Sequence, residues 1–414
     1  MGMLDRLSAF GGLNRDAKIL VYTRALRSFS VAILTVSFTI YLSKLGASAV
    51  TLGLAFTGMS LFSAVRSFIE GVIADRYGRK PILLYSAGLM IVGGAVYTLT
   101  QDLGILLVTA VLVGVGGRLP YTPVEQAILT ENVSSEDRTK AFSINSFLGT
   151  LAGVFGSFAA GLPELLQSWG VPELFSYRPV FAVFAIAGAV TFVFFTLIEE
   201  TVSRGGSVDE VEADEEMGVD ERRLLMKWSA VIALDMVGGS FLGNFVSYWF
   251  YLRFGVGPGA IGTFFGASRF LAAFSYFLGL KIAERVGTIR AIVISRVPVV
   301  FVNALTPLLP GYTATALVRG FMSLFSMIDV PLRQSYLMGV VGSRRRASAA
   351  GVVTVVSRFT AAGAPLLTGY SFQYVSISLP FYVAASFQFL SLSLMYLLFR
   401  DIRPPEEQRV DPGR

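Results

Sequence analysis

Twelve long apolar stretches constrain the fold of this chain more than any other feature of its sequence. About 20 apolar residues span a bilayer as one helix, and backbone that faces lipid must satisfy its own hydrogen bonds. We therefore expect an all-α membrane protein with twelve transmembrane helices. The predicted spans are residues 19–42, 48–69, 82–100, 104–127, 140–162, 179–197, 226–251, 260–280, 289–307, 313–335, 347–370 and 379–399.

The composition agrees with this fold class and excludes several kinds of chemistry. Only 15% of the residues are charged, against about 25% in soluble domains. The chain has no cysteine and no histidine, which excludes a disulfide framework and a Cys/His metal centre. Any proton coupling must therefore use Asp or Glu. Without a nucleophile–base constellation we expect no enzyme activity, no metal and no cofactor.

Basic residues in the connecting loops indicate the orientation of the chain. Almost all loop Lys and Arg residues fall on one side of the predicted spans, and the other side has only Lys44, Arg178 and Arg253. Loops rich in Lys and Arg stay in the cytoplasm. We expect a multi-pass protein of the cytoplasmic (inner or plasma) membrane with both termini inside. The net charge of +6 then reflects topology, and no nucleic-acid partner is expected.

The sequence divides into two matching halves. An acidic segment, 199–224, separates a predicted six-helix bundle at 1–198 from a second at 225–400, and 401–414 forms a cytoplasmic tail. Repeated halves of this kind are typical of alternating-access transporters. A shift of 208 residues superposes Gly71 on Gly279, Pro123 on Pro331, Gln126 on Gln334 and Arg138 on Arg346.

The loop after the second span carries a specific motif, Gly71-Val-Ile-Ala-Asp75-Arg76-Tyr-Gly78-Arg79-Lys80. It resembles motif A of the major facilitator superfamily, Gly-x-x-x-Asp-Arg-x-Gly-Arg-Arg/Lys. A partial copy with Thr288 at the second basic position follows the eighth span. The resemblance implies two pseudo-symmetric six-helix bundles and a conformational-switch role for both copies. The residues concerned are Gly71, Asp75, Arg76, Gly78, Arg79, Glu284, Arg285 and Gly287.

Small residues in the fifth and eleventh spans resemble a second family element. Gly149, Gly153, Gly156 and Gly161 lie in the fifth span, and Gly363 to Gly369 in the eleventh contains Pro365. Both stretches resemble motif C of the drug–proton antiporter branch, although Ser157 takes the proline position in the fifth span. The alternative interpretation is close helix packing by small residues.

Ionisable residues deep in predicted spans are the candidate functional residues, because such residues are costly in lipid and usually functional. Arg27 lies on a polar stripe of the first span, and Asp235 is its counterpart at the 208-residue shift. The two are candidates to pair across a central cavity, or Asp235 to carry a proton. We assign to the substrate or coupling cavity Arg27, Arg118, Asp235, Arg269, Asp329 and Arg358.

A second counterpart pair, Glu125 and Arg333, lies near the predicted cytoplasmic ends of the fourth and tenth spans. The resemblance implies that these ends meet when the cytoplasmic gate closes, so we predict an ion pair between them in the outward-facing state. The alternative is that each pairs with a neighbour inside its own half. With Asp235 and Asp329, Glu125 is also a candidate proton carrier.

The favoured function is secondary active transport of a small solute by alternating access, coupled to protons, with export favoured. One alternative is transport of an organic or inorganic anion, because guanidinium groups bind carboxylate and phosphate. An alternative of another class is a non-transporting membrane sensor. The expected partners are the solute, protons and lipid, and we expect a monomer. Symport, antiport and uniport stay open.

Overall fold

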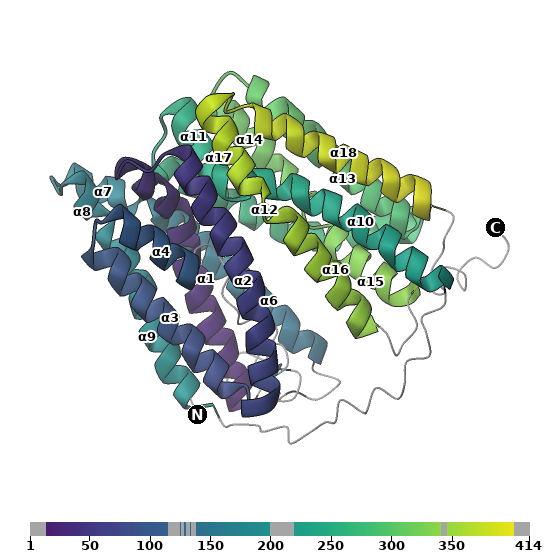
Figure 1. Ribbon diagram of the computed structural model, residues 1–414, viewed down its shortest axis with the longest axis horizontal. Helices are drawn as coiled ribbons and strands as arrows, with labels where there is room; N and C mark the ends of the chain where they lie inside the picture. The colour runs from purple at the N-terminus through teal and green to yellow at the C-terminus, as the bar shows by residue number, and fades with distance from the viewer. Residues whose placement is uncertain are drawn as a thin grey trace. The chain divides into compact units, whose positions relative to one another are not determined.

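The computed structural model describes residues 14–114, 125, 128–129, 133, 138–198, 219–340 and 346–400. Within these ranges the regular structure is helical, with no strand (Figure 1). Among the described residues, eight helical segments are long and apolar enough to cross a membrane, and Leu103–Val113 is a shorter apolar helix. The predicted linker residues 199–218 and the tail 401–414 lie outside the described ranges.

In the described part of the first half, two helices of 30 and 29 residues are accompanied by several shorter ones. They are α1 (Arg15–Lys44), α2 (Ala49–Tyr77), α3 (Lys80–Leu99), α4 (Leu103–Val113), α6 (Arg138–Phe158), α7 (Leu162–Ser168), α8 (Glu173–Ser176) and α9 (Arg178–Thr196).

The second half continues the same pattern. Its helices are α10 (Val219–Leu242), α11 (Val246–Phe254), α12 (Pro258–Val286), α13 (Thr288–Leu305), α14 (Tyr312–Met322), α15 (Asp329–Val340), α16 (Arg346–Ala361), α17 (Ala364–Tyr374) and α18 (Leu379–Phe399).

Helix packing repeats between the two halves. In the first half α1 packs on α6 and α9, and α3 packs on α9. In the second half α10 packs on α16 and α18, and α13 packs on α18. The 208-residue shift relates these pairs of helices to one another. The repeat found in the sequence is therefore also a repeat of tertiary packing.

The backbone contacts divide the chain into two compact units. One holds the described residues of Met1–Ala47, Gly58–Val208 and Val256–Gly266, and the other those of Ser48–Thr57, Asp209–Gly255 and Ala267–Arg414. The start of α2 thus belongs to the second unit, where Leu366 N donates to Thr57 Oγ1 at 3.1 Å. The start of α12 belongs to the first unit, where Gly259 meets Gly161.

Among the described residues, three spans that the sequence predicts as single helices are interrupted, so that prediction is wrong at these positions. The fourth span leaves the helix after Val113, at Gly114 with φ +88°. The tenth span breaks between α14 and α15, and the eleventh between α16 and α17. The reason in the tenth and eleventh spans is proline, which lacks an N–H and starts new helices in their first turn. Pro331 stands in the first turn of α15, and Pro365 in the first turn of α17.

The helix-to-helix turn of motif A has the same backbone in both halves. Gly78, between α2 and α3, has φ +93°, and Gly287, between α12 and α13, has φ +84°. Only glycine adopts this region without strain. Gly78 therefore forms a tight turn between the two helices, and Gly287 forms its counterpart.

Aromatic side chains build the core of each unit. In the first unit Phe38 and Tyr97 have ring centroids 4.9 Å apart. In the second, Trp228 of α10 stacks on Tyr336 of α15 at 4.8 Å, and Phe399 of α18 meets it edge-on. These contacts hold α10, α15 and α18 together beside the buried charges described below.

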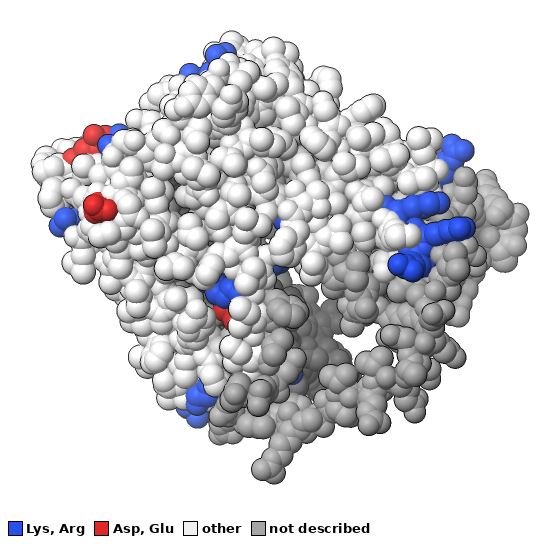
Figure 2. All heavy atoms as spheres, viewed as in Figure 1, with Lys and Arg blue, Asp and Glu red and all other residues white. Residues whose placement is uncertain are grey.

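The outer surface is rich in exposed apolar side chains. Val92, Phe155 and Phe301 are each more than half exposed, and uncharged residues dominate the described surface in Figure 2. Large exposed apolar areas are unusual in water-soluble monomers. The surface therefore fits contact with lipid.

Candidate functional site

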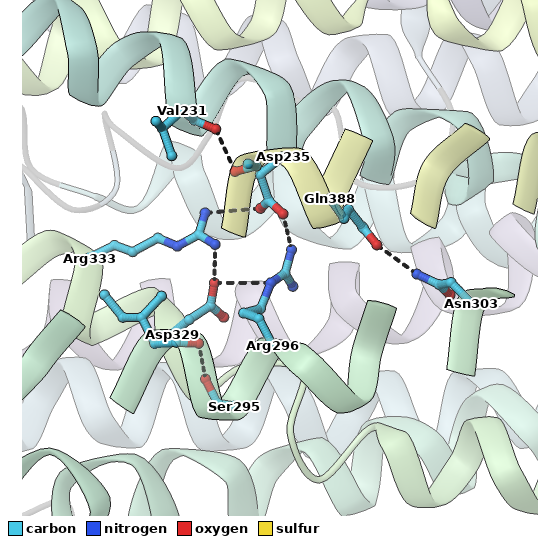
Figure 3. Close-up of polar contacts among 10 residues, drawn as sticks. Val231, Asp235, Ser295, Arg296, Asn303, Asp329, Arg333 and Gln388 are labelled. Atoms are coloured by element: carbon cyan, nitrogen blue, oxygen red, sulfur yellow. Dashed lines mark hydrogen bonds and ion pairs between the residues drawn. The ribbon is translucent and has the colours of Figure 1, made fainter. Parts of the chain in front are cut away.

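Two buried aspartates and two partly buried arginines form a closed cluster in the second half of the chain, which we call the tetrad: Asp235, Arg296, Asp329 and Arg333 (Figure 3). Arg333 Nη1 donates to Asp235 Oδ2 at 2.9 Å, and its Nη2 lies 2.9 Å from Asp329 Oδ2. Arg296 bonds to Asp235 Oδ1 through Nη2, and its Nε lies 3.7 Å from Asp329 Oδ2. Each arginine therefore contacts both aspartates.

Three helices position the tetrad. Asp235 comes from α10 and Arg296 from α13, whereas Asp329 and Arg333 lie one turn apart on α15. Side chains four residues apart share a helix face, which aligns this last pair. Asp329 is the first residue of α15, where the helix dipole stabilises a negative charge. The break in the tenth span thus places this carboxylate at a helix N-terminus.

The tetrad is shielded from solvent and electrically balanced. Asp235 is 5% exposed and Asp329 3%, and two positive charges match two negative ones. Removing one partner of a buried ion pair leaves an uncompensated charge, which costs about 3–5 kcal/mol. The charges are balanced, but the hydrogen bonding of the cluster is incomplete. Among the described residues, Asp329 Oδ1 and Arg333 Nε are buried without a hydrogen-bond partner.

The first half of the chain has an ion pair at related positions. Arg27 of α1 bonds to Glu125, and both side chains are buried. The Arg27 guanidinium also lies over the Phe195 ring, 5.3 Å from its centroid. The 208-residue shift maps Arg27 onto Asp235 and Glu125 onto Arg333. The same two positions are therefore paired in each half, with the charges exchanged.

This pairing bears on two sequence predictions, an ion pair between Glu125 and Arg333 in the outward-facing state and a contact of Arg27 with Asp235 across a central cavity, which both stay predictions. In this structure Glu125 bonds to Arg27, and Arg333 bonds to Asp235. Each residue thus has a partner inside its own half, which was the alternative for the gate pair. The 208-residue repeat brings the same two positions side by side in each bundle, and in both bundles their charges are opposite.

Two further predicted cavity residues that the structure describes, Arg269 and Arg358, form no ion pair with the tetrad. Arg118 lies outside the described residues. Arg269 on α12 is half-buried, and Arg358 is exposed in the last turn of α16, just before the break in the eleventh span.

The residues of the switch motif are described only in part. Gly71, Asp75 and Arg76 belong to α2, and Glu284 to α12, but their side chains lie outside the described part of the structure. Arg79 is the residue before α3, and Arg285 is exposed. Their proposed switch role stays a prediction.

Sequence reasoning missed Arg296, which binds both aspartates of the tetrad. It lies inside the ninth predicted span, 289–307, and a count of every charge in that span would have found it. The 208-residue repeat does not indicate a functional residue here, because the counterpart of Arg296 in the first half is Gly88.

Glu70 was also missed, because it follows the predicted end of the second span by one residue. It is buried, and Arg66 Nε lies 3.5 Å from its Oε1. Arg66 Nη1 also donates to Leu112 O at 2.9 Å, near the end of α4. Arg66 of α2 therefore stabilises the C-terminal end of the short helix α4.

Arg319 has a neutral environment. Its Nη1 donates to Asn303 Oδ1 at 3.2 Å and to Thr306 Oγ1 at 3.0 Å, and Asn303 donates to Gln388 Oε1 at 2.8 Å. Its guanidinium lies 5.6 Å from the centroid of the Phe381 ring. These contacts connect α13, α14 and α18, so we interpret Arg319 as structural.

The family model of the Major Facilitator Superfamily matches residues 20–312 and 228–413. This chain belongs to that superfamily. Its fold is accordingly the major facilitator fold, with twelve membrane-spanning segments in two pseudo-symmetric six-helix bundles. It is a multi-pass membrane transporter, and the segments beyond the eight clear spans fit that fold.

Two curated relatives illustrate the range of similarity. An uncharacterized membrane protein of Saccharomyces cerevisiae is 23% identical over 394 residues, covering 86% of this chain and 88% of that protein. The multidrug resistance protein MdtL of a Shewanella species is 30% identical over 162 residues, or 39% of each chain. The predicted resemblance to drug exporters thus has counterparts among the relatives.

Solved transporter structures share the fold. A bacterial homolog of the human lysosomal transporter Spinster has a TM-score of 0.69 at 16% identity, over 93% of this chain and 96% of that one. A peptide transporter of the POT family has a TM-score of 0.71 at 12% identity, over 94% and 98%. At these identities the likeness concerns the fold alone.

Proposed function

We propose that this protein is a secondary active transporter that couples the movement of a small solute to protons. The observation that supports coupling is the tetrad, a buried and balanced cluster in which two arginines share two aspartates. The chain contains no histidine. Carboxylates are therefore the groups available to carry the proton.

The tetrad suits a proton switch for a simple electrostatic reason. An aspartate between two guanidinium groups stays ionised, because nearby positive charge favours the charged form. When a change of conformation moves the guanidinium groups away from the aspartate, the buried carboxylate favours the protonated form. Proton binding is then tied to the conformational state, which is the requirement for coupling.

We favour export of a small amphipathic solute, because several relatives are named as multidrug resistance proteins. Anion transport is the second candidate. Three of the arginines give anion transport little support, because Arg27, Arg296 and Arg333 are each paired with a carboxylate. Arg269 and Arg358 have no carboxylate partner among the described residues and keep this candidate open.

Transport in proteoliposomes tests the coupling. Wild-type protein should drive net movement of a fluorescent amphipathic dye when a pH gradient is imposed. Asp235→Asn should lose at least tenfold of that gradient-driven transport and keep dye exchange in the absence of a gradient, because an amide cannot carry the proton. Asp102→Asn is the matched control, since Asp102 is an exposed N-cap of α4 and Asn caps equally well.

Two outcomes would contradict the proposal. Gradient-driven transport that survives Asp235→Asn, together with survival in Asp329→Asn, would remove the tetrad from coupling. A wild-type protein that exchanges no solute in a broad panel, including organic anions, would favour the non-transporting sensor.

A further inference from the structure

Arg319 is a buried arginine that the proposed function does not use. It lies in α14, which begins at Tyr312, so it stands about 10 Å along the helix from its first residue. It forms no ion pair with the tetrad. We propose that the Nε–Nη2 edge of the Arg319 guanidinium binds a small inorganic monovalent anion such as chloride.

The protein contacts of Arg319 use one nitrogen and one face of its guanidinium group. Nη1 donates to Asn303 Oδ1 at 3.2 Å and to Thr306 Oγ1 at 3.0 Å. Asn303 is oriented by its own bond to Gln388 Oε1 at 2.8 Å (Figure 3), so its oxygen faces the arginine. The face of the guanidinium lies over the Phe381 ring, 5.6 Å from its centroid.

The opposite edge of the same group has donors to offer. Both hydrogen bonds that Arg319 makes in the described part of the chain come from Nη1, and its Nε is buried without a hydrogen-bond partner there. In a guanidinium group, Nε–H and one N–H of Nη2 point in the same direction. This edge therefore presents two parallel donors, the arrangement with which arginine binds anions.

The helices around Arg319 supply no negative charge. Asn303 belongs to α13 and Phe381 to α18, and neither of these helices nor α14 contains an aspartate or a glutamate. The same holds for α11, whose Trp249 packs on Phe381 with ring centroids 4.7 Å apart. The amide of Asn303 and the hydroxyl of Thr306 accept hydrogen bonds but carry no charge. The positive charge of Arg319 is thus not neutralised by these neighbours.

Among the described residues of the second half, the buried aspartates belong to the tetrad. Asp329 follows Arg319 in sequence across the break between α14 and α15, and it lies 2.9 Å from Arg333. Asp235 is bonded to Arg296 and Arg333. The four charges of the tetrad add to zero, so the tetrad offers no counter-charge to Arg319.

Charge balance therefore favours an anion at this edge. A buried positive charge without a counter-charge is unfavourable in a low-dielectric interior. A water molecule at the same edge would accept the hydrogen bonds but leave the charge unchanged, whereas a monovalent anion does both. Arg319 is only 7% exposed, which suits a small ion rather than an organic solute.

The consequence of binding is structural. Arg319 already connects α13, α14 and α18 through its contacts, and neutralising its charge stabilises the packing of these helices. The anion is bound to the folded protein and is distinct from the transported solute. This inference goes beyond the proposed function and does not depend on it.

Chloride binding to the purified full-length protein tests the proposal. The protein is prepared in sodium gluconate, and radiolabelled chloride is then titrated at constant ionic strength. The wild type should bind chloride saturably and approach one ion per protein. Its thermal unfolding midpoint should rise over the same range of concentration, because a ligand that binds only the folded state stabilises it.

Three variants sharpen the result. Arg319→Gln keeps a side-chain donor but removes the charge, so it should lose both the saturable binding and the rise of the unfolding midpoint. Arg319→Lys keeps the charge but loses the two-donor edge, so it should bind chloride roughly tenfold more weakly. Arg253→Gln is the matched control, because Arg253 is an exposed arginine of α11. It should bind chloride as the wild type does.

The proposal is overturned if chloride does not bind saturably, which is the result expected when water occupies the edge. Equal binding by Arg319→Gln and the wild type, or loss of binding in Arg253→Gln, would also overturn it. If Arg319→Gln does not fold, Arg319→Lys decides, and an affinity equal to that of the wild type refutes the site. Proton-driven dye transport is a separate measurement, so failure of the proposed function is distinguishable from failure of the anion site.

Discussion

At the scale of single residues, the sequence identified which positions carry buried charge but not which side chains meet. Arg27, Glu125, Asp235 and Arg333 were all predicted as functional from their depth and their symmetric spacing. Their pairing depends on the rotation of each helix about its axis and on the choice between neighbours in one bundle. Neither quantity can be read from spacing alone. Arg296 shows the same limit, since it joins the tetrad without a counterpart in the first half.

The Arg27–Glu125 pair makes a prediction about stability. Glu125→Ala should lower the free energy of unfolding by about 3–5 kcal/mol, because it leaves a buried guanidinium without its counter-charge. Exchanging the two charges, Arg27→Glu with Glu125→Arg, should restore part of the loss. Chemical unfolding in detergent, followed by tryptophan fluorescence, measures both variants.

An exposed ion pair on the same unit provides the control. Lys44 and Glu173 also form a pair, but the Glu173 side chain is 54% exposed. Glu173→Ala should therefore cost no more than about 1 kcal/mol. An equal loss of unfolding free energy in Glu125→Ala and Glu173→Ala would show that the buried pair stabilises the protein no more than the exposed one.

At the scale of helices, hydropathy predicted where spans lie, and proline decided where they break. The second span was predicted to end at residue 69, but α2 continues to Tyr77 and carries most of the switch motif on a helix. The charged residues in this last part of α2 lower its hydropathy, so a hydropathy criterion does not include it in the span. The glycines of the helix interfaces were predicted to allow close packing, and the structure locates their partners. Gly156, for example, faces the backbone of Phe29 in α1.

The α3–α9 contact makes a prediction about packing. A methyl group at Gly94 would lie 2.5 Å from Ala185 N and 2.7 Å from its Cα. Gly94→Ala should therefore push α9 away and destabilise the protein by about 1–3 kcal/mol, as overpacking does. The control on the same helix is Gly88→Ala, because a Cβ there meets nothing within 4 Å. Thermal unfolding in detergent compares the two, and an unchanged Gly94→Ala would contradict this account of the interface.

At the scale of the whole molecule, the 208-residue repeat predicted the fold well, because duplicated sequence produces duplicated packing. The compact units were harder to predict. The starts of α2 and α12 each join the unit formed mainly by the other half. Such an exchange depends on contacts between residues far apart in the sequence, such as Thr57 and Leu366, and no local sequence pattern predicts it.

The orientation of the chain can be tested because the protein has no cysteine. Trp169→Cys places a thiol at a site that is 70% exposed between α7 and α8. It should react with a membrane-impermeant maleimide on intact cells. Arg290→Cys, at the exposed start of α13, should react only after the membrane is permeabilised. The reverse labelling pattern would overturn the predicted orientation of the termini.

The balanced charge of the tetrad also has a consequence for the response to membrane voltage. Moving one elementary charge through 100 mV changes the energy by about 2.3 kcal/mol. A cluster with two positive and two negative side chains contributes no such term when its exposure changes from one side of the membrane to the other. A proton carried alone by one of its aspartates would make that step voltage-dependent, whereas a proton that moves together with a monovalent anion would make it electrically silent again. The current that accompanies transport thus reports directly on what the tetrad carries.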